Sequence, residues 1–248
     1  MGTTADARRI AVLGGAGGIG RAVVADLVLA GHEVVVLDLA VSLDRHKPAA
    51  PGIEVDILSE PSVTVAMEAL ADRWPSVDGF VNLAGYGRPV EPLAETASEQ
   101  FDDIVAGNLR GTFLATKAIL PMMADQGSIV LIASGLAQFV RPGHGAYAAA
   151  KAGVIALAKT FALECAPRVR VNTVAPGLVQ TAFLTGGTGR SEETDESSVP
   201  VEALLATIPL QRHATPEDIA GPIRFLLELS SAFMTGQVLW VNGGSYMP

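Results

Sequence analysis

Cysteine is nearly absent from this chain. Among 248 residues only Cys165 carries a thiol, which excludes an intrachain disulfide and any metal cluster built from cysteines. Phe161, Ala162 and Leu163 precede it, so we expect a helix that buries the thiol against the core. We expect no metal site.

Basic residues are also scarce. Lysine and arginine total 17 against 26 aspartates and glutamates, a net charge of −9. Nucleic acids and anionic membranes are bound by clustered lysine and arginine, so neither is an expected partner. Charged or turn residues interrupt every long apolar stretch, and the N-terminus lacks the apolar segment of a secretory signal. We therefore expect no membrane span and a cytoplasmic location.

Hydrophobic residues, in contrast, make up 49% of the chain and charged residues 17%, a composition that favours a compact fold. The length suits one large domain that spans residues 1–248. Short β-branched segments alternate with helix-length amphipathic ones, and the predicted strands are residues 10–13, 33–37, 79–83, 128–132, 168–174 and 237–241. Near-continuous apolar strands separated by helices predict a doubly wound α/β fold, in which helices cover both faces of a parallel sheet.

A run of glycines follows the first predicted strand. Gly14, Gly18, Ile19 and Gly20 lie where that strand turns into a helix. Glycines let the backbone approach a pyrophosphate closely, and the free N–H groups at a helix start attract its charge. A strand, then glycines, then a helix indicates a Rossmann-type dinucleotide site.

Asp38 ends the second predicted strand, 18 residues after Gly20. A carboxylate at this point can accept hydrogen bonds from both hydroxyls of an adenosine ribose, and it repels a 2′-phosphate. NAD is therefore the expected cofactor in preference to NADP. The alternative is a surface acid that caps a turn.

Tyr147 and Lys151 lie four residues apart, which places both side chains on one face of a helix. A tyrosine is a poor base at neutral pH because its pKa is about 10, but a nearby cation favours the phenolate. Ser134 adds a hydroxyl 13 residues before Tyr147. The set predicts proton transfer at an alcohol or ketone oxygen.

In these features the chain resembles the short-chain dehydrogenase/reductase family, and the resemblance covers nearly the whole sequence. The glycine spacing, Tyr147 and Lys151 match that family's motifs. Further matches in the family's order are Asn82-Leu83-Ala84-Gly85, Asn108, Ser134, Asn172, Pro176-Gly177, Thr181 and Asn242-Gly243-Gly244. Leu13 replaces the family's threonine before the first glycine, and Leu83 replaces an asparagine. We expect these two changes to tune cofactor affinity and to leave the chemistry intact.

The resemblance implies specific roles. Tyr147 would be the acid and base, and Lys151 would lower the pKa of Tyr147 and hold the nicotinamide ribose. Ser134 would orient the substrate oxygen, and Asn108 would anchor a water that relays protons. The implied cofactor contacts are Gly14, Gly18, Ile19, Gly20, Asp38, Asp56, Ile57, Asn82, Ala84, Gly85, Tyr147, Lys151, Pro176, Gly177, Val179 and Thr181. Asp56 can instead be a helix cap.

The candidate substrate contacts form a mostly apolar set: Gly135, Leu136, Gln138, His144, Leu178, Phe183 and Leu184. This set favours a hydrophobic or cyclic secondary alcohol over a charged sugar acid. His144 either binds a polar group of the substrate or faces solvent. Residues 185–201 are polar and glycine-rich and predict either a solvated loop or a substrate lid, so we expect a substrate loop at about residues 183–205.

The sequence therefore predicts an NAD-dependent oxidoreductase that interconverts a small-molecule secondary alcohol and a ketone. One alternative is a 3-oxoacyl-thioester reductase or 3-hydroxyacyl dehydrogenase of the same family. Another is a non-catalytic NAD-sensing protein on the same fold. The resemblance also implies a homodimer or homotetramer, assembled through the helices that carry Asn108 and Tyr147.

Overall fold

The computed structural model describes residues 7–87, 90–185, 189–190 and 204–247. The strands are β1 (Arg9–Leu13), β2 (Glu33–Asp38), β3 (Gly52–Glu54), β4 (Val77–Asn82), β5 (Met123–Ile132), β6 (Val169–Pro176) and β7 (Val238–Val241). They form one sheet in the order β3-β2-β1-β4-β5-β6-β7, and every neighbouring pair is parallel. The predicted doubly wound α/β fold is confirmed.

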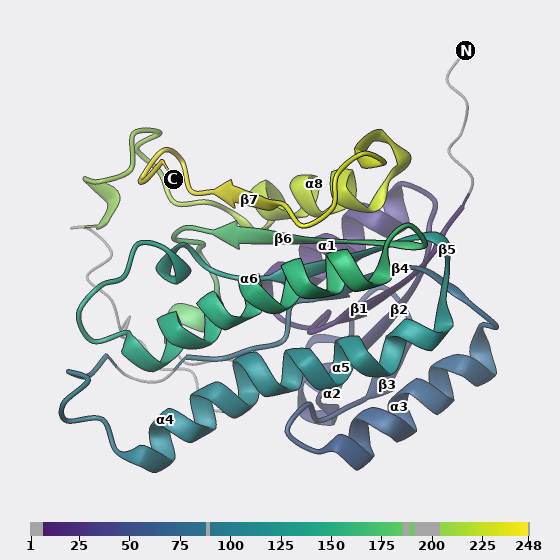
Figure 1. Cartoon of the computed structure of the whole chain (residues 1–248), viewed down its shortest axis with the longest axis horizontal. Coiled ribbons are helices and arrows are strands. Elements are labelled where there is room, and N and C mark those ends of the chain that lie inside the picture. The colour runs from purple at the N-terminus through teal and green to yellow at the C-terminus, as the bar shows by residue number, and fades with distance from the viewer. Residues whose placement is uncertain (1–6, 88–89, 186–188, 191–203, 248) are drawn as a thin grey trace.

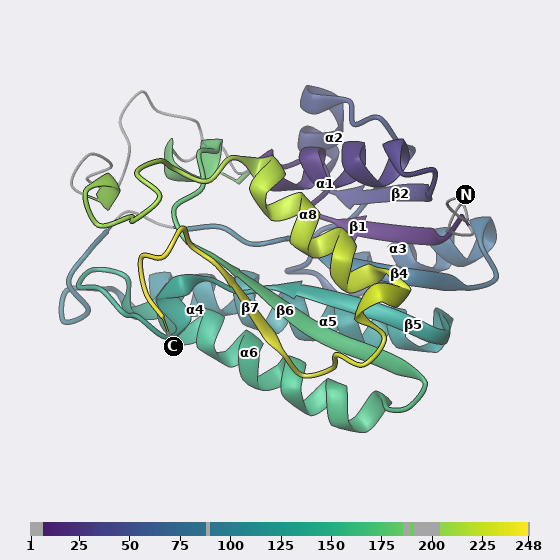
Figure 2. The same ribbon diagram turned by 90° about the horizontal axis from the view of Figure 1, so that it is seen from above.

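Helices cover both faces of this sheet (Figures 1 and 2). They are α1 (Gly18–Leu29), α2 (Ala40–His46), α3 (Glu60–Arg73), α4 (Ser98–Val105), α5 (Gly111–Ile119), α6 (Gly145–Cys165) and α8 (Pro216–Leu227). Shorter turns are η1 (Ala106–Arg110), η2 (Leu120–Met122), η3 (Gly135–Ala137), η4 (Ala182–Thr185) and η5 (Leu229–Ser231). Helices α3, α5 and α6 lie on one face, and α1 and α8 lie on the other.

The alternation of side chains along the strands explains this layering. In β1, Ala11 and Leu13 pack with α3, α5 and α6, whereas Ile10 and Val12 pack with α1 and α8. Successive residues of a strand point to opposite faces, so a strand buried on both sides needs an unbroken apolar run. The apolar runs that predict the strands are therefore required by the two cores.

Helix α6 is apolar and 21 residues long, with a mean hydropathy of 1.3 in its most apolar window, so by length and composition it could cross a membrane. Its Val154, Ala158 and Phe161 are buried in the core beneath β5 and β6. These are the contacts of a core helix in an α/β fold. Cys165, at the end of the same helix, is partly buried and packs against this core, as expected for its helix, although its thiol is not fully buried.

All seven strands run in the same direction, so their carboxyl ends meet at one edge, on the left of Figure 1. The strand order reverses at β1 and β4, because β1 is followed outward by β2 on one side and by β4 on the other. In doubly wound sheets, ligands bind outside the carboxyl ends of the strands at such a switch point. We therefore expect a ligand site among the loops that follow Leu13, Asp38 and Asn82.

Candidate active site

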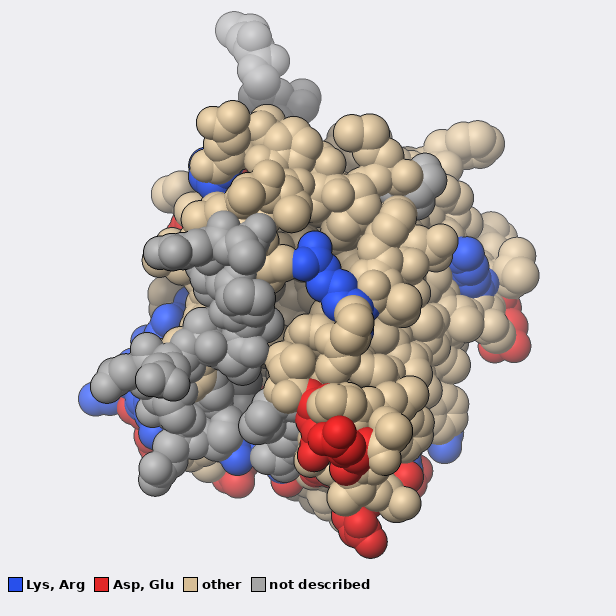
Figure 3. Space-filling view, turned by 90° about the vertical axis from the view of Figure 1, so that its left-hand side faces the viewer, with Lys and Arg blue, Asp and Glu red and all other residues tan. Residues whose placement is uncertain are grey.

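A cavity of about 550 Å³ opens at this edge of the sheet. Most of the predicted site residues line it: Gly14, Gly18, Ile19, Gly20, Asp38, Ile57, Ala84, Gly85, Ser134, Tyr147, Lys151, Pro176, Gly177, Val179 and Thr181. Figure 3 views the molecule from this side, and its described surface is largely uncharged, with one cluster of acidic side chains below the centre and other charges scattered around it. The cavity thus joins the glycine run to the tyrosine and lysine in one space.

Close packing explains three of the glycines at one end of this cavity. Gly14 has a φ of +78°, and a Cβ atom there would lie 2.8 Å from the backbone nitrogen of Ala84. A Cβ atom on Gly20 would lie 2.1 Å from the carbonyl oxygen of Gly14. A Cβ atom on Gly18 would lie 2.7 Å from Cγ2 of Thr181. The glycines therefore let the loop fold tightly on itself and let the segment after β6 approach it.

The N-terminus of α1 has the character of an anion site. Its N-cap, Gly17, provides no side-chain cap, and the first turn contains no acidic residue. The first N–H groups of a helix lack partners within the helix and carry a partial positive charge. A 12-residue helix that begins without a cap at a glycine loop fits the pyrophosphate of a dinucleotide.

Asp38 is held at the end of β2 by two backbone groups. Its Oδ2 accepts a hydrogen bond from the Ala16 N–H at 2.9 Å, and its Oδ1 accepts one from the Leu39 N–H at 2.8 Å. Burial raises the pKa of Asp38, and the two backbone hydrogen bonds oppose that rise. The side chain is fixed against the glycine loop while it still lines the cavity.

Ser134, Tyr147 and Lys151 meet at the other end. Ser134 follows β5, and its Oγ accepts the Leu136 N–H at 3.2 Å, which caps η3. Tyr147 and Lys151 project from the start of α6, with the Lys151 Nζ 5.6 Å from the centroid of the Tyr147 ring. Nζ also donates to the carbonyl oxygen of Ile132 at 3.2 Å. The spacing that predicts one helix face thus brings both groups to the cavity.

The pKa values of this pair are set mainly by burial. Burial raises the pKa of Tyr147, and a hydrogen bond from Ser134 opposes the rise. Burial lowers the pKa of Lys151 to about 8, because the ammonium loses water and is only 2% exposed. The pKa of Tyr147 is therefore shifted upward overall, with burial as the largest cause and Ser134 as the opposing group, and a lowering of this pKa by Lys151 stays a prediction.

Asn108 lies behind the cavity wall, in η1, a π-helical turn between α4 and α5. Its Nδ2 donates to the carbonyl oxygens of Tyr86 at 2.8 Å and Ile104 at 3.1 Å. Its Oδ1 is buried and has no hydrogen-bond partner. A Cβ atom on Gly85 would lie 2.5 Å from this oxygen and 3.2 Å from the Lys151 Nζ. Asn108 and Lys151 therefore approach each other at Gly85, which separates them only by its backbone.

Three other predicted residues do not line the cavity. Asn82 is buried, and its Oδ1 accepts the Ala84 N–H at 3.1 Å, so it shapes the turn after β4. Asp56 accepts the Leu58 N–H at 2.8 Å. Gln138 is exposed, because η3 turns Leu136 toward the cavity and directs Gln138 away from it. The prediction of Gln138 as a substrate contact is corrected accordingly.

The remaining substrate candidates line the catalytic end: Gly135, Leu136, His144, Leu178, Phe183 and Leu184. The centroid of the Phe183 ring lies 5.8 Å from the centroid of the Tyr147 ring. His144 is partly buried, and burial lowers its pKa. The prediction of a substrate loop at about residues 183–205 falls mostly outside the described residues, which there comprise 183–185, 189–190 and 204–205.

The sequence interpretation missed several residues of the lining, which is more polar than expected. Glu91, Gln100 and Arg141 contribute to it, and Tyr246 reaches it from the C-terminal segment. Tyr246 stacks on Phe139 with ring centroids 4.3 Å apart. These residues match no motif and come from segments far apart in the chain, so their spacing in the sequence does not predict that they meet.

Comparisons with known proteins show which families and structures this chain resembles. A family profile described as Enoyl-(Acyl carrier protein) reductase matches residues 14–246. A short-chain type dehydrogenase/reductase of Sinorhizobium fredii is 35% identical over 96% of this chain, which spans only 43% of that relative's length. A 3-oxoacyl-[acyl-carrier-protein] reductase of Thermotoga maritima is 33% identical over 94% of this chain and 95% of the relative.

One further relative and one solved structure are also similar to this chain. A 2-(S)-hydroxypropyl-CoM dehydrogenase of Xanthobacter autotrophicus is 34% identical over 95% of both chains. The crystal structure of a short-chain dehydrogenase/reductase of Brucella melitensis, titled glucose/ribitol dehydrogenase, superposes with a TM-score of 0.86 at 27% identity and full coverage of both chains. The profile, the relatives and the shared fold together show that this chain belongs to the short-chain dehydrogenase/reductase family of oxidoreductases.

Proposed function

We propose that this oxidoreductase uses NAD to interconvert a secondary alcohol and a ketone. The observation that carries the proposal is one cavity that contains Ser134, Tyr147 and Lys151 at one end and Asp38 beside an uncapped helix start at the other. The family typically uses NAD or NADP. The preference for NAD rests on Asp38, whose carboxylate can bind ribose hydroxyls and opposes a 2′-phosphate.

The residues of the cavity fit a nicotinamide dinucleotide. The glycine loop and the start of α1 would hold the pyrophosphate, Asp38 the adenosine ribose, and Asp56 and Ile57 the adenine. Lys151 would hold the nicotinamide ribose, and the segment from Pro176 to Thr181 the nicotinamide carboxamide. Bound in this way, the cofactor supplies a hydride acceptor.

Tyr147 is the acid and base in this proposal. In the oxidation its phenolate oxygen takes the proton of the substrate hydroxyl, and in the reduction its hydroxyl gives that proton back. Ser134 hydrogen-bonds the same substrate oxygen and orients it. Lys151 stabilises the phenolate, a contribution that grows when the positive charge of an oxidised nicotinamide is added nearby. Asn108 would hold a water through its unpartnered Oδ1 and pass the proton onward.

The lining of the cavity and the relatives of the chain indicate two candidate substrate classes. The aromatic and aliphatic lining around Phe183 and Leu178 supports a hydrophobic or cyclic alcohol, and one relative is titled as a dehydrogenase of a 2-hydroxypropyl compound. A 3-oxoacyl-thioester is the second candidate, because similar proteins are titled 3-oxoacyl-[acyl-carrier-protein] reductases. A cytoplasmic location and a homodimer or homotetramer complete the proposal, as does the absence of nucleic-acid and membrane partners.

The test is a substrate panel assayed at about 340 nm with NAD(H) and NADP(H) in parallel, including cyclic ketones and a 3-oxoacyl thioester. We expect turnover with a ketone or secondary alcohol and a higher kcat/KM with the NAD pair. Tyr147→Phe should lose at least about 1000-fold in kcat, because it removes the proton carrier and keeps the ring, while NAD binding is retained. Near-normal turnover by this variant contradicts the assignment. Tight NAD binding without turnover on any substrate would favour an NAD-sensing protein.

A further inference from the structure

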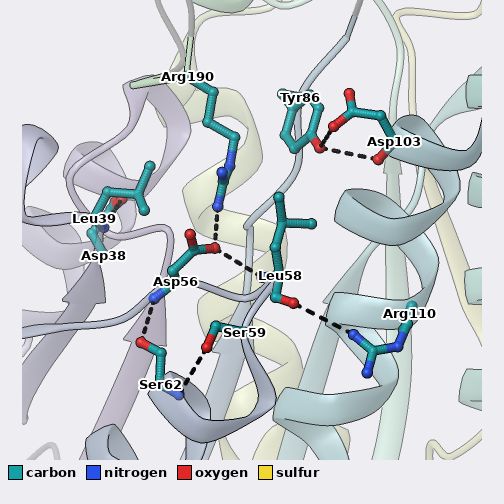
Figure 4. A network of polar contacts seen from close by, with 10 residues as sticks. All are labelled: Asp38, Leu39, Asp56, Leu58, Ser59, Ser62, Tyr86, Asp103, Arg110 and Arg190. Carbon is teal, nitrogen blue, oxygen red and sulfur yellow. Dashed lines mark hydrogen bonds and ion pairs between the residues drawn. The ribbon is translucent and has the colours of Figure 1, made fainter. Parts of the chain in front are cut away.

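Arg190 lies at the adenine end of the cavity and forms an ion pair with Asp56 (Figure 4). The Arg190 Nη2 donates to Oδ1 of Asp56, which also accepts the Leu58 N–H. The arginine side chain is 20% exposed and the aspartate side chain 40%. Arg190 lines the cavity and Asp56 does not, so the guanidinium borders the cavity at the position of the proposed adenine contact.

The same guanidinium lies over an aromatic ring. Its central carbon is 5.5 Å from the centroid of the Tyr86 ring, within the range of a cation–π contact. Tyr86 is 3% exposed, and its hydroxyl contacts the carbonyl oxygen and Oδ1 of Asp103 at 3.0 and 2.9 Å. The ring is therefore fixed, and Arg190 is held by a carboxylate and by an aromatic surface together.

The backbone before Arg190 passes close to the end of β2. Gly189 has a φ of +78°, and a Cβ atom there would lie 2.5 Å from Oγ of Ser42 and 3.4 Å from Cδ1 of Leu39. Leu39 directly follows Asp38, the proposed ribose contact. Gly189 and Arg190 thus span the distance from the ribose side to the adenine side of the proposed adenosine site.

A guanidinium and an adenine compete for such a position. Both are planar and offer N–H donors to a carboxylate, and both stack on flat surfaces. Because Arg190 lines the cavity and Asp56 does not, an adenine that reaches Asp56 from the cavity meets the guanidinium first. Oδ1 of Asp56 also accepts the Leu58 N–H, so this oxygen has little acceptor capacity left while Arg190 is bound.

We propose that Arg190 determines the affinity for the cofactor, by occupying the place of adenine on Asp56 until the nucleotide displaces it. This inference rests on the proposed NAD site. A partly exposed ion pair and one cation–π contact must be given up on binding, so removal of Arg190 tightens binding by about 5- to 30-fold.

The test compares the affinities of AMP and nicotinamide mononucleotide, the two halves of NAD, by calorimetric titration. Arg190→Ala should bind AMP and NAD about 5- to 30-fold more tightly than the wild type, with nicotinamide mononucleotide unchanged within about twofold. Arg190→Gln, which keeps a donor and loses the charge, should lie between them. Arg141→Ala is the matched control, because it removes the same charge from another part of the lining and should not tighten AMP binding.

The outcomes distinguish a failure of the role given to Arg190 from a failure of the proposed NAD site. If Arg190→Ala binds AMP less tightly, the arginine holds the nucleotide in place, and the inference is overturned. Unchanged AMP affinity overturns it equally, as does equal tightening in Arg141→Ala. If the wild type and every variant bind neither NAD nor AMP while circular dichroism shows them folded, the proposed cofactor site is wrong and the inference falls with it.

Discussion

The hydroxyl oxygen of Tyr246 lies 1.4 Å from the point where a Cβ atom on Gly135 would stand. Tyr246 cannot retreat easily, because its ring stacks on Phe139 and meets the Trp240 ring edge to face at 5.9 Å. Gly135 directly follows Ser134 at the turn that presents the serine hydroxyl. The C-terminal segment therefore requires a glycine beside a proposed catalytic residue.

Gly135→Ala should consequently lower both stability and activity. The added methyl must displace a packed aromatic ring, which costs about 1–3 kcal/mol of unfolding free energy, and the shift moves Ser134. The control is Gly221→Ala, since a Cβ atom at that position in α8 meets nothing within 4 Å and should stabilise the helix by up to about 1 kcal/mol. Chemical denaturation and kcat/KM measure the pair. Equal effects in the two variants would contradict the role of Tyr246.

Lys151→Met should abolish turnover but stabilise the protein at neutral pH. The folded-state pKa of about 8 lies below the ordinary 10.5, so between these values the unfolded chain binds more protons and stability rises with pH. At pH 7 the full cost of the buried charge applies, about 3 kcal/mol for a folded-state pKa of about 8. The loss of the hydrogen bond to Ile132 subtracts from this gain.

The advantage of Lys151→Met should therefore shrink as the pH rises from about 8 to 10. Unfolding midpoints at several pH values give the measurement. Lys159→Met is the control, because Lys159 lies exposed on the same helix and its loss should change stability by less than about 0.5 kcal/mol. A constant advantage at all pH values would mean that packing, and not charge burial, is responsible.

Asp38→Asn should weaken the discrimination against NADP. The amide removes the charge that opposes a 2′-phosphate while keeping a similar shape, and a loss of about 2 kcal/mol corresponds to a change of about 30-fold in the ratio of the two kcat/KM values. Asp44→Asn makes the same charge change at an exposed position of α2 and should leave the ratio nearly unchanged. If both variants change the ratio of the two kcat/KM values equally, the discrimination comes from the net charge of the protein and not from the position of Asp38.

Thr181 allows its two possible contributions to be separated. Its Cβ and Cγ2 pack on Gly18, and its hydroxyl is the proposed cofactor contact. Thr181→Val keeps the packing and should raise the KM for NAD about 5- to 10-fold, the value of one hydrogen bond, without a change in stability. Thr181→Ser keeps the hydroxyl and should retain the KM. The opposite ranking would assign Thr181 to packing alone.

The sequence by itself determined the features that depend only on short stretches of the chain. Apolar runs in Ile10–Leu13 and Glu33–Leu37 located strands, since a parallel strand buried on both faces admits few polar residues. The spacing of Tyr147 and Lys151 placed both on one helix face, because helical geometry is fixed over four residues. The glycines marked the turn after β1, and Asp38 marked the end of β2. Each of these signals lies within a short stretch of chain.

The tertiary structure alone decided what depends on segments that are distant in sequence. It placed Tyr246 against Gly135, Arg190 on Asp56, and Asn108 beside Lys151 across Gly85. It also turned Gln138 away from the cavity and made burial the main influence on the pKa of Tyr147. The burial of a side chain and its long-range contacts depend on neighbours from many parts of the chain. No local sequence pattern contains this information, on which the proposed cofactor affinity and proton transfer depend.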